Sequence, residues 1–581
     1  MILESLANEL LLYLFEYLST NHLIYAFHGL NSRFNFLLFH HFTINGLDFR
    51  SIYSCDFDTI CREYLPTLID KVPALYLSER NGPSELVNRL NDDGFSLDRF
   101  VRLKSFSLNY LSDEDFINKI MLALPYLVNL THLSLEYCLM GKDFAKVLSP
   151  GLPFVDCIWS LPKLTQCYFH LPLGRFPVPS VTSSSITHLF VFHVYDDVLK
   201  LGLLFEYTPN LQHFSTSIVN NCLIQFSMSP VPSITSFEIS LYDSDTNLRP
   251  DILQWMPNIC RLKVDCNRLL DGHDWKQIIS NHLPKLKTFH FRMKYTYEIN
   301  DVPQELAEQL LNTFRSPFWV DEHRWFVRCD SCPTRGWIFI YTLPYAFDDF
   351  SVYGRLLSKS TCPQEKNLQT YDCVRELTYD VEPSICSQLS DIQFNKPEKM
   401  RLRLPVDDYF WSIVPTFDHL TSLQVQASDI NEECTKQFQL LLSRASHLSS
   451  LSIWIFFNSG HAVDLLLGTK HVSIKRIDLG ELSDGFDEEQ CMRLSRSPFA
   501  MQCEELRIHV THRSSICYLV KMMPNLRSLY VYCQYDQPEE TFSKNELVDW
   551  LREQLLGVRP LIEISRSYNT VRLEMRQNSS T

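Results

Sequence analysis

Two cysteines are the residues of this sequence best suited to metal or redox chemistry. Cys329 and Cys332 have the Cys-x-x-Cys spacing of half a zinc site or of a redox pair. The next cysteines along the chain, Cys362 and Cys373, lie in a different segment and do not form a second close pair. We therefore favour two ordinary thiols at a hairpin turn and expect no metal site.

Other catalytic patterns are missing from the sequence. The 19 histidines include no HExxH motif, and no GxGxxG, P-loop or GxSxG motif is present to place a phosphate or a nucleophile. Acidic pairs such as Asp348 with Asp349 are more typical of solvated loops than of paired catalytic carboxylates. We therefore expect a protein that is not an enzyme and that uses no cofactor.

A second group of residues is suited to protein recognition. Aromatic and arginine side chains at the solvent-facing positions of strands are typical of interface hot spots. Such positions are occupied here by Phe190, Phe192, His290, Arg292, Trp454, Arg507, Tyr530 and Tyr532. We expect these residues to bind a protein substrate, the alternative being that a hairpin or helices cover some of them.

The elements that present these side chains come from a repeated phrase, which is clearest from Leu130 to Cys138. Leu133 and Leu135 alternate with polar neighbours, so one face of this strand is apolar and the other faces water. The middle apolar residue of the phrase recurs every 22 to 34 residues, at Leu133, Cys167, Leu189, Phe214, Phe237, Leu262 and Phe289. One such strand cannot bury its apolar face alone, so the repeats must stack.

This period is close to that of leucine-rich repeats, and the chain resembles that family. The resemblance implies an α/β fold, a curved solenoid or horseshoe in which strands alternate with helices. We expect Leu133, Leu189, Leu262, Leu451 and Leu529 to be buried. The expected organisation is a helical segment over 1–42, a first repeat arm over 43–294, an insertion over 295–372 with a β-hairpin near 318–341, a second arm over 373–540, and a C-terminal cap and tail over 541–581.

The first helix, expected from Leu6 to Leu18, is apolar over two faces. Leu10, Leu14 and Leu18 form one stripe, while Leu11 and Phe15 form a second stripe beside it. A second helix and a third apolar segment follow, but three short helices can bury only one side of the first. The remaining stripe predicts a partner or contact with the adjoining repeats.

The phrases Leu6-Ala-Asn-Glu-Leu10-Leu11, Phe15-Glu-Tyr-Leu18 and Leu30-Asn-Ser-Arg33-Phe34 are similar to the F-box. This sequence has Ala7 where that family usually has proline. The resemblance implies that the helices bind the F-box adaptor subunit through Leu6, Leu10, Leu11, Phe15, Leu18, Leu30 and Arg33. The chain would then be a non-catalytic substrate receptor of an SCF-type cullin–RING ubiquitin ligase. The alternative is a leucine-rich-repeat interaction scaffold whose N-terminal helices only cap the solenoid.

The amino-acid composition limits the classes of binding partner and the cellular compartment that we expect. The net charge of −15 and the lack of clustered Lys and Arg argue against a nucleic-acid partner. The first 32 residues contain no Lys or Arg, and no run of about 18 apolar residues follows, so we expect neither export nor a membrane anchor. The 18 cysteines form no tight framework, which indicates a reducing compartment, the cytoplasm or the nucleus.

Overall fold

The protein is described from a computed structural model, in which the chain divides into two compact units, Met1–Lys294 and Tyr295–Thr581. Each unit is described separately. The described residues are 3–50, 52, 54–78, 96–111, 114–138, 154–170, 179–195, 199–219, 230–241, 251–296, 303–332, 336–354, 357–363, 371–381, 392–427, 431–455, 464–467, 469–480, 485–533, 546–555, 562–567 and 570–575.

Unit 1 begins with a short 3-10 turn and three helices: η1 (Leu3–Ser5), α1 (Asn8–Phe15), α2 (Thr20–Phe27) and α3 (Ser32–Asn45). Each of the last two helices has a polar N-cap, because Ser19 accepts a hydrogen bond from the His22 N–H and Asn31 accepts one from the Phe34 N–H. α3 ends at Gly46, whose φ is +84° and where a Cβ would overlap the Ala74 carbonyl. A glycine is therefore required where the chain leaves α3.

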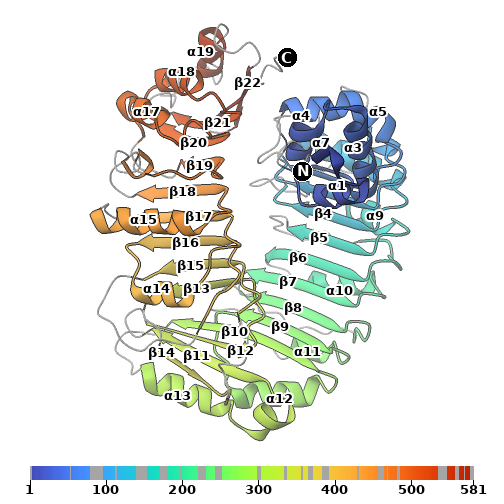
Figure 1. Cartoon of the computed structure of the whole chain (residues 1–581). Coiled ribbons are helices and arrows are strands. Elements are labelled where there is room, and N and C mark those ends of the chain that lie inside the picture. The colour runs from blue at the N-terminus through green and yellow to red at the C-terminus, as the bar shows by residue number, and fades with distance from the viewer. Residues whose placement is uncertain are drawn as a thin grey trace. The chain divides into compact units, whose positions relative to one another are not determined.

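A parallel sheet follows, and its strands pair in chain order (Figure 1). The strands are β1 (Leu47–Phe49), β2 (Ala74–Ser78), β3 (Ser105–Asn109), β4 (His132–Glu136), β5 (Gln166–His170), β6 (His188–Tyr195), β7 (His213–Val219), β8 (Ser236–Leu241), β9 (Arg261–Cys266) and β10 (Thr288–Thr296). Parallel neighbours need a crossover between them, and here that crossover contains a short helix in most repeats.

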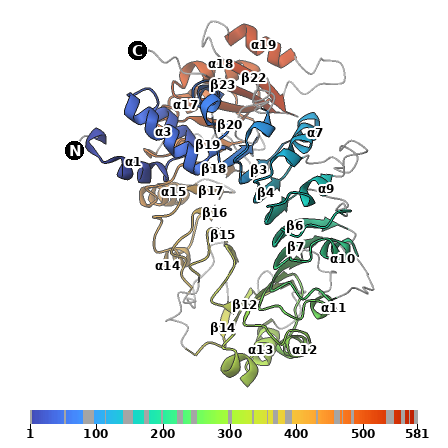
Figure 2. The same ribbon diagram turned by 90° about the vertical axis from the view of Figure 1, so that its right-hand side faces the viewer.

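The connecting helices of unit 1 lie along one side of the strands, as α9, α10 and α11 do in both views (Figures 1 and 2). They are α4 (Ser54–Thr59), the π-helix η2 (Ile60–Tyr64), α5 (Leu65–Leu68), η3 (Leu97–Arg99), α7 (Glu114–Ala123), η4 (Leu124–Tyr126), α9 (Phe154–Trp159), α10 (Leu199–Glu206), α11 (Asp251–Gln254) and α12 (Gly272–His282). The core of the unit lies between these helices and the apolar face of the sheet.

The middle apolar residues of the repeated phrase form one continuous row across the unit 1 sheet. Leu133 lies opposite Cys167, and the row continues through Leu189, Phe214, Phe237, Leu262 and Phe289. Each of these side chains is at most 2% exposed. The predicted phase of the repeats is confirmed, including the burial of Leu133, Leu189, Leu262, Leu451 and Leu529.

Polar side chains at one position of the phrase join successive repeats. The side-chain amide of an asparagine donates a hydrogen bond to a backbone carbonyl one repeat earlier. The pairs are Asn129 to Val101 at 2.8 Å, Asn210 to Ser184 at 2.7 Å, Asn258 to Pro232 at 2.7 Å and, in unit 2, Asn525 to Met501 at 2.5 Å. These bonds satisfy carbonyls that the strand pairing does not use.

Unit 2 starts with an irregular segment. It contains α13 (Pro303–Thr313), the π-helix η5 (Phe318–Glu322), and three antiparallel strands, β11 (Phe326–Cys332), β12 (Trp337–Leu343) and β14 (Leu357–Ser360). The predicted hairpin is present between β11 and β12. The expected range of the hairpin, 318–341, is too long at its start, because Phe318 to Val320 belong to the π-helix η5 and the first strand begins at Phe326.

A buried polar network holds this irregular segment together. The Arg328 guanidinium contacts the Asp330 carboxylate at 3.0 Å, and both side chains are almost fully buried. Tyr341 donates a hydrogen bond to the same carboxylate at 2.6 Å, and its hydroxyl lies 2.7 Å from that of Tyr371. Each buried charge therefore has a partner, which a charge in an apolar interior requires.

A second sheet forms the rest of unit 2. Its parallel strands are β13 (Asp349–Tyr353), β15 (Glu376–Asp380), β16 (Lys399–Leu404), β17 (Ser422–Ala427), β18 (Ser450–Ile455), β19 (Arg476–Leu479), β20 (Glu505–Val510) and β21 (Ser528–Cys533), and the antiparallel β23 (Thr570–Met575) and β22 (Ile562–Ser567) complete it. Its helices are α14 (Asp408–Ile413), α15 (Glu432–Arg444), α17 (Glu488–Ser495), α18 (Arg513–Met522) and α19 (Glu546–Leu555). The sheet thus begins inside the segment expected to be an insertion, because β13 pairs with β15.

The row of buried residues makes a direct prediction. We expect Leu262→Ala to lower the free energy of unfolding by ~2–5 kcal/mol, because it removes a side chain that is 1% exposed from a close-packed row. Urea denaturation followed by tryptophan fluorescence measures the change. Leu203→Ala in α10 is the control, since Leu203 is 43% exposed and should change stability little. Equal effects of the two variants would contradict the packing of this row.

Candidate functional site

An exposed apolar stripe runs along the first helix. Leu10, Tyr13, Leu14 and Tyr17 follow the i, i+3, i+4, i+7 spacing of one helical face, and their side chains are 54%, 56%, 42% and 70% exposed. The Tyr17 hydroxyl donates to the Tyr13 hydroxyl at 2.6 Å, and the two rings meet edge to face. We call these four residues the α1 stripe. A row of large apolar groups in water is typical of a surface that binds another protein.

The second stripe of this helix belongs to the core. Leu11 and Phe15 are completely buried, and the Phe15 ring lies 4.8 Å from that of Phe27, which in turn contacts Phe34. Fully buried side chains do not form a docking surface, so Leu11 and Phe15 lie on the core side of the first helix, and adaptor contact by the rest of the predicted set stays a prediction. The role of Leu11 and Phe15 is to fix α1 against α2 and α3.

The remaining predicted adaptor residues are placed differently. Leu6 and Leu18 are half-buried, whereas Leu30 is exposed at the end of α2. The Arg33 guanidinium donates to the carbonyls of Glu4 and Leu6, both at 2.5 Å, and to the Asn8 side chain at 2.9 Å. Arg33 therefore turns toward its own chain and positions the segment that leads into α1, which corrects its predicted role as a direct contact.

Sequence reasoning missed Tyr13 and Tyr17, although the signal was present. Both tyrosines stand at the helical spacing from Leu10 and Leu14, and a pattern restricted to leucines leaves them out.

A buried histidine makes the helical segment sensitive to pH. His41 in α3 is 8% exposed, its ring packs on Phe15, and its Nδ1 lies 3.1 Å from the Asn45 amide nitrogen. Burial lowers the pKa of His41, because the charged imidazolium loses its hydration. In the unfolded chain the pKa is about 6.5. The unfolded state therefore binds more protons below that pH, and the stability present above pH ~6.5 falls as the pH drops toward the folded-state pKa.

We expect the free energy of local opening of α3 to be smaller at pH 5.5 than at pH 7.5. Amide hydrogen exchange of residues 32–45, corrected for intrinsic rates, measures this difference. His41→Phe should remove most of it, while His40→Gln, at the exposed neighbouring histidine, should leave it in place. A pH dependence that persists unchanged in His41→Phe would contradict the assignment.

The predicted recognition residues of unit 1 lie on the polar face of its sheet in two groups. Phe190 and Phe192 on β6 pack on Tyr168, with ring centroids 5.6 and 5.3 Å apart. On β10, Arg292 forms an ion pair with Asp265 at 2.7 Å, and burial lowers the pKa of His290. The two groups are four strands apart, or roughly 19 Å at a strand spacing of ~4.8 Å. They therefore form separate contact points.

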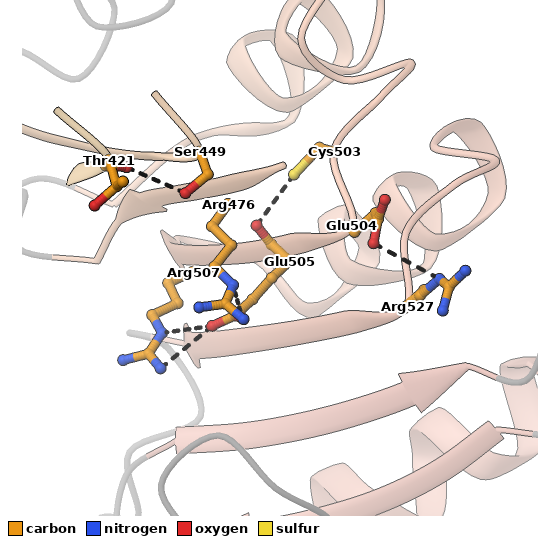
Figure 3. A network of polar contacts seen from close by, with 8 residues as sticks. All are labelled: Thr421, Ser449, Arg476, Cys503, Glu504, Glu505, Arg507 and Arg527. Carbon is orange, nitrogen blue, oxygen red and sulfur yellow. Dashed lines mark hydrogen bonds and ion pairs between the residues drawn. The ribbon is translucent and has the colours of Figure 1, made fainter. Parts of the chain in front are cut away.

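In unit 2, Arg507 lies in a network of charges on the polar face of the second sheet. Figure 3 shows Glu505 between the guanidinium groups of Arg476 and Arg507, with a closest contact of 3.3 Å to each. The Arg507 guanidinium also lies over the Tyr530 ring, 4.6 Å from its centroid. Just before the next strand, the Arg527 guanidinium is 3.9 Å from the carboxylate of Glu504, which itself precedes β20.

The structure adds an arginine that was not predicted. β23 is antiparallel to β21, and Arg572 lies opposite Tyr530 with its guanidinium 5.2 Å from the ring centroid. The ring thus contacts two cations. Burial raises the pKa of Tyr530 to about 12, because the phenolate would lose its hydration.

Trp454 and Tyr532, the other two predicted residues of unit 2, each have a polar neighbour. The Arg401 guanidinium lies 5.5 Å from the centroid of the Trp454 ring, and His509 meets the Tyr532 ring edge to face at 4.6 Å. Both aromatic side chains are half-buried. Aromatic faces and guanidinium groups at these positions can bind another protein by stacking and by charge-assisted hydrogen bonds.

The two cysteines of the Cys-x-x-Cys pair lie on a strand and not at a turn. Cys329 is central in β11 and Cys332 ends it, so their side chains leave opposite faces of the strand, and both are buried. Burial raises the pKa of the Cys329 thiol well above its usual range, which keeps it protonated. Within the described residues, no group of three or more His, Cys, Asp or Glu side chains could hold a metal ion.

A scan against protein-family models finds none that fits this chain, and a search of curated protein sequences finds no significant relative. In the part of the chain that the structure describes, no helix combines the length and the apolar character needed to cross a membrane.

Proposed function

We propose that this chain is a non-catalytic substrate-recognition subunit of an SCF-type cullin–RING ubiquitin ligase. The N-terminal helices dock the F-box adaptor subunit, and the polar face of the repeat sheets binds a protein substrate. Such a subunit acts in the cytoplasm or the nucleus and needs no cofactor. The observation that carries the proposal is the α1 stripe, which leaves four large apolar side chains in water on a segment with the F-box pattern.

Two details of the helical segment agree with an F-box. Ala7, where the family usually has proline, has φ of −63°, which is close to the value that a proline ring imposes. The backbone at the start of α1 is therefore the one a proline would favour. Arg33 donates two hydrogen bonds to the segment that precedes α1 and a third to the side chain of Asn8, the first residue of α1, so the stripe is presented on a fixed backbone.

The sheets support the receptor half of the proposal. Parallel strands in chain order, with one buried residue every 22 to 34 positions, are what a leucine-rich-repeat solenoid requires. The polar face of such strands forms a continuous surface. Aromatic and arginine side chains on that face, such as Phe190, Arg507 and Tyr530, provide contacts of the kind that dominate protein interfaces.

A scaffold whose helices only cap the solenoid is the second candidate, because part of the helical segment does contact the first repeat. The His28 Nδ1 lies 2.9 Å from the Tyr64 hydroxyl, and the Phe42 ring meets the Tyr64 ring edge to face. Both residues belong to the segment from α2 to α3. This capping contact leaves the α1 stripe exposed, which is why we prefer the adaptor-binding function.

We expect recombinant F-box adaptor to retain the full chain in a pull-down, and the double variant Leu10→Asp, Leu14→Asp to abolish retention. Both side chains are exposed in the free chain, so the variant should stay folded, as circular dichroism can check. Two carboxylates buried in the interface would oppose the ~8 kcal/mol that a micromolar complex supplies.

The matched control is Leu203→Asp with Met522→Asp, two apolar side chains that are each 43% exposed on helices outside the N-terminal segment. This control should bind the adaptor as the unmodified chain does. Equal binding by the stripe variant, or no binding by the unmodified chain, would favour the capping scaffold.

A further inference from the structure

A cavity of about 270 Å³ opens on the polar face of the unit 1 sheet. One row of paired residues crosses it: Tyr76 on β2, Ser107 on β3, Ser134 on β4, Tyr168 on β5 and Phe190 on β6. The two serines are small and lie between large rings, so the row is hollow at its centre. Cavities that hold drug-sized ligands measure about 300–1,000 Å³, so this one suits a single long side chain.

The charges at this cavity leave one negative charge in excess. Arg50 is paired with Asp48 through two contacts of 3.0 and 2.7 Å, and its guanidinium lies 4.8 Å from the centroid of the Tyr76 ring. Glu136 also lines the cavity and accepts a hydrogen bond from the Ser134 hydroxyl at 2.9 Å. Asp48 does not line the cavity, but it pairs with Arg50 and so offsets the charge of that guanidinium. One guanidinium and two carboxylates therefore give a local net charge of 1 − 2 = −1, and the Glu136 carboxylate is the one that faces the cavity. A cation entering the cavity would balance it.

Stacked rings lie beside the cavity. Glu136 shares its row with His170 and Phe192, whose rings are 5.5 Å apart. Tyr137 stacks on Tyr110 at 4.7 Å and lies 4.0 Å from His170. Both tyrosines have positive φ, 56° for Tyr110 and 52° for Tyr137, a backbone conformation that bulky side chains rarely adopt and that recurs at ligand sites.

We propose that this cavity binds an arginine side chain of the protein substrate, with a neighbouring apolar residue of that substrate on the stack of Tyr110, Tyr137, His170 and Phe192. The guanidinium pairs with the Glu136 carboxylate on β4 and lies against the ring of Tyr168 on the neighbouring strand β5. The identification of the bound protein as a substrate rests on the proposed function, whereas the binding itself does not involve the adaptor.

Arginine fits this site better than the other basic side chain. Its planar guanidinium can stack on an aromatic ring and pair with a carboxylate at the same time, whereas the lysine ammonium is a compact and strongly hydrated point charge. An acidic side chain would add a third carboxylate to the two already present. A neutral side chain would leave the excess charge unbalanced.

The test uses the purified full chain without adaptor and four fluorescein-labelled peptides. Each peptide has one Phe-X pair in a Gly/Ser sequence, with X as Arg, Lys, Gln or Glu, and fluorescence polarisation gives the Kd. We expect the Arg peptide to bind most tightly, the Lys peptide more weakly, and the Gln and Glu peptides at least tenfold more weakly than Arg. Glu136→Gln should weaken Arg-peptide binding at least fivefold, and Ser134→Phe, which fills the cavity, should abolish it.

Glu238→Gln is the control. Glu238 lies on the same face of the sheet, forms an ion pair of 2.7 Å with Lys263, and does not line the cavity. The variant should leave the Kd unchanged. Equal affinity for the Arg and Glu peptides, unchanged binding by both Glu136→Gln and Ser134→Phe, or no binding of any peptide would each overturn the inference. Adaptor retention by the same preparation is scored separately, so failure here is distinguishable from failure of the proposed function.

Discussion

The structure depends on one constraint: a single repeat cannot bury the apolar face of its own strand, so neighbouring repeats and the connecting helices must cover it together. In unit 1 the constraint appears as the row from Leu133 to Phe289, and in unit 2 as a row of eight residues that are at most 3% exposed: Leu377, Met400, Leu423, Leu451, Ile477, Leu506, Leu529 and Leu573. Because side chains alternate along a strand, fixing the buried row also fixes the opposite face. Tyr168 lies beside Phe190, and Arg507 beside Tyr530, as a result.

Where the repeats are interrupted, other interactions stabilise the fold. In β11 and β12 the core includes the Arg328, Asp330 and Tyr341 network, and an aromatic cluster surrounds Trp319. At the N-terminus the three short helices bury Leu11 and Phe15 but have too little volume to cover the α1 stripe. The surface left exposed there follows from size, since a segment of some forty residues cannot enclose every apolar side chain it carries.

The alternation of apolar and polar residues and the regular spacing of the repeated phrase were sufficient to predict the buried rows. Which side chains of a strand are buried depends on the local sequence, with a period of two. Local signals also predicted the hairpin of β11 and β12, and predicted that the three short helices bury only one of the two stripes of the first helix, without indicating which one. They failed where a residue's role depends on distant partners. The inward turn of Arg33 depends on the carbonyls of Glu4 and Leu6, and the position of Arg572 depends on the antiparallel pairing of β23. The cavity forms only when five strands pair in register and place two serines between larger side chains, which the local sequence does not show.

We propose the α1 stripe as the docking surface for the F-box adaptor. Hydrogen exchange of the full chain, alone and with recombinant adaptor, tests it most directly because it reports where the partner sits. We expect added adaptor to slow exchange in residues 3–18 and at the end of α2, and to leave exchange in β4 to β10 unchanged. Slowed exchange confined to the repeat strands, or no change anywhere, would contradict it.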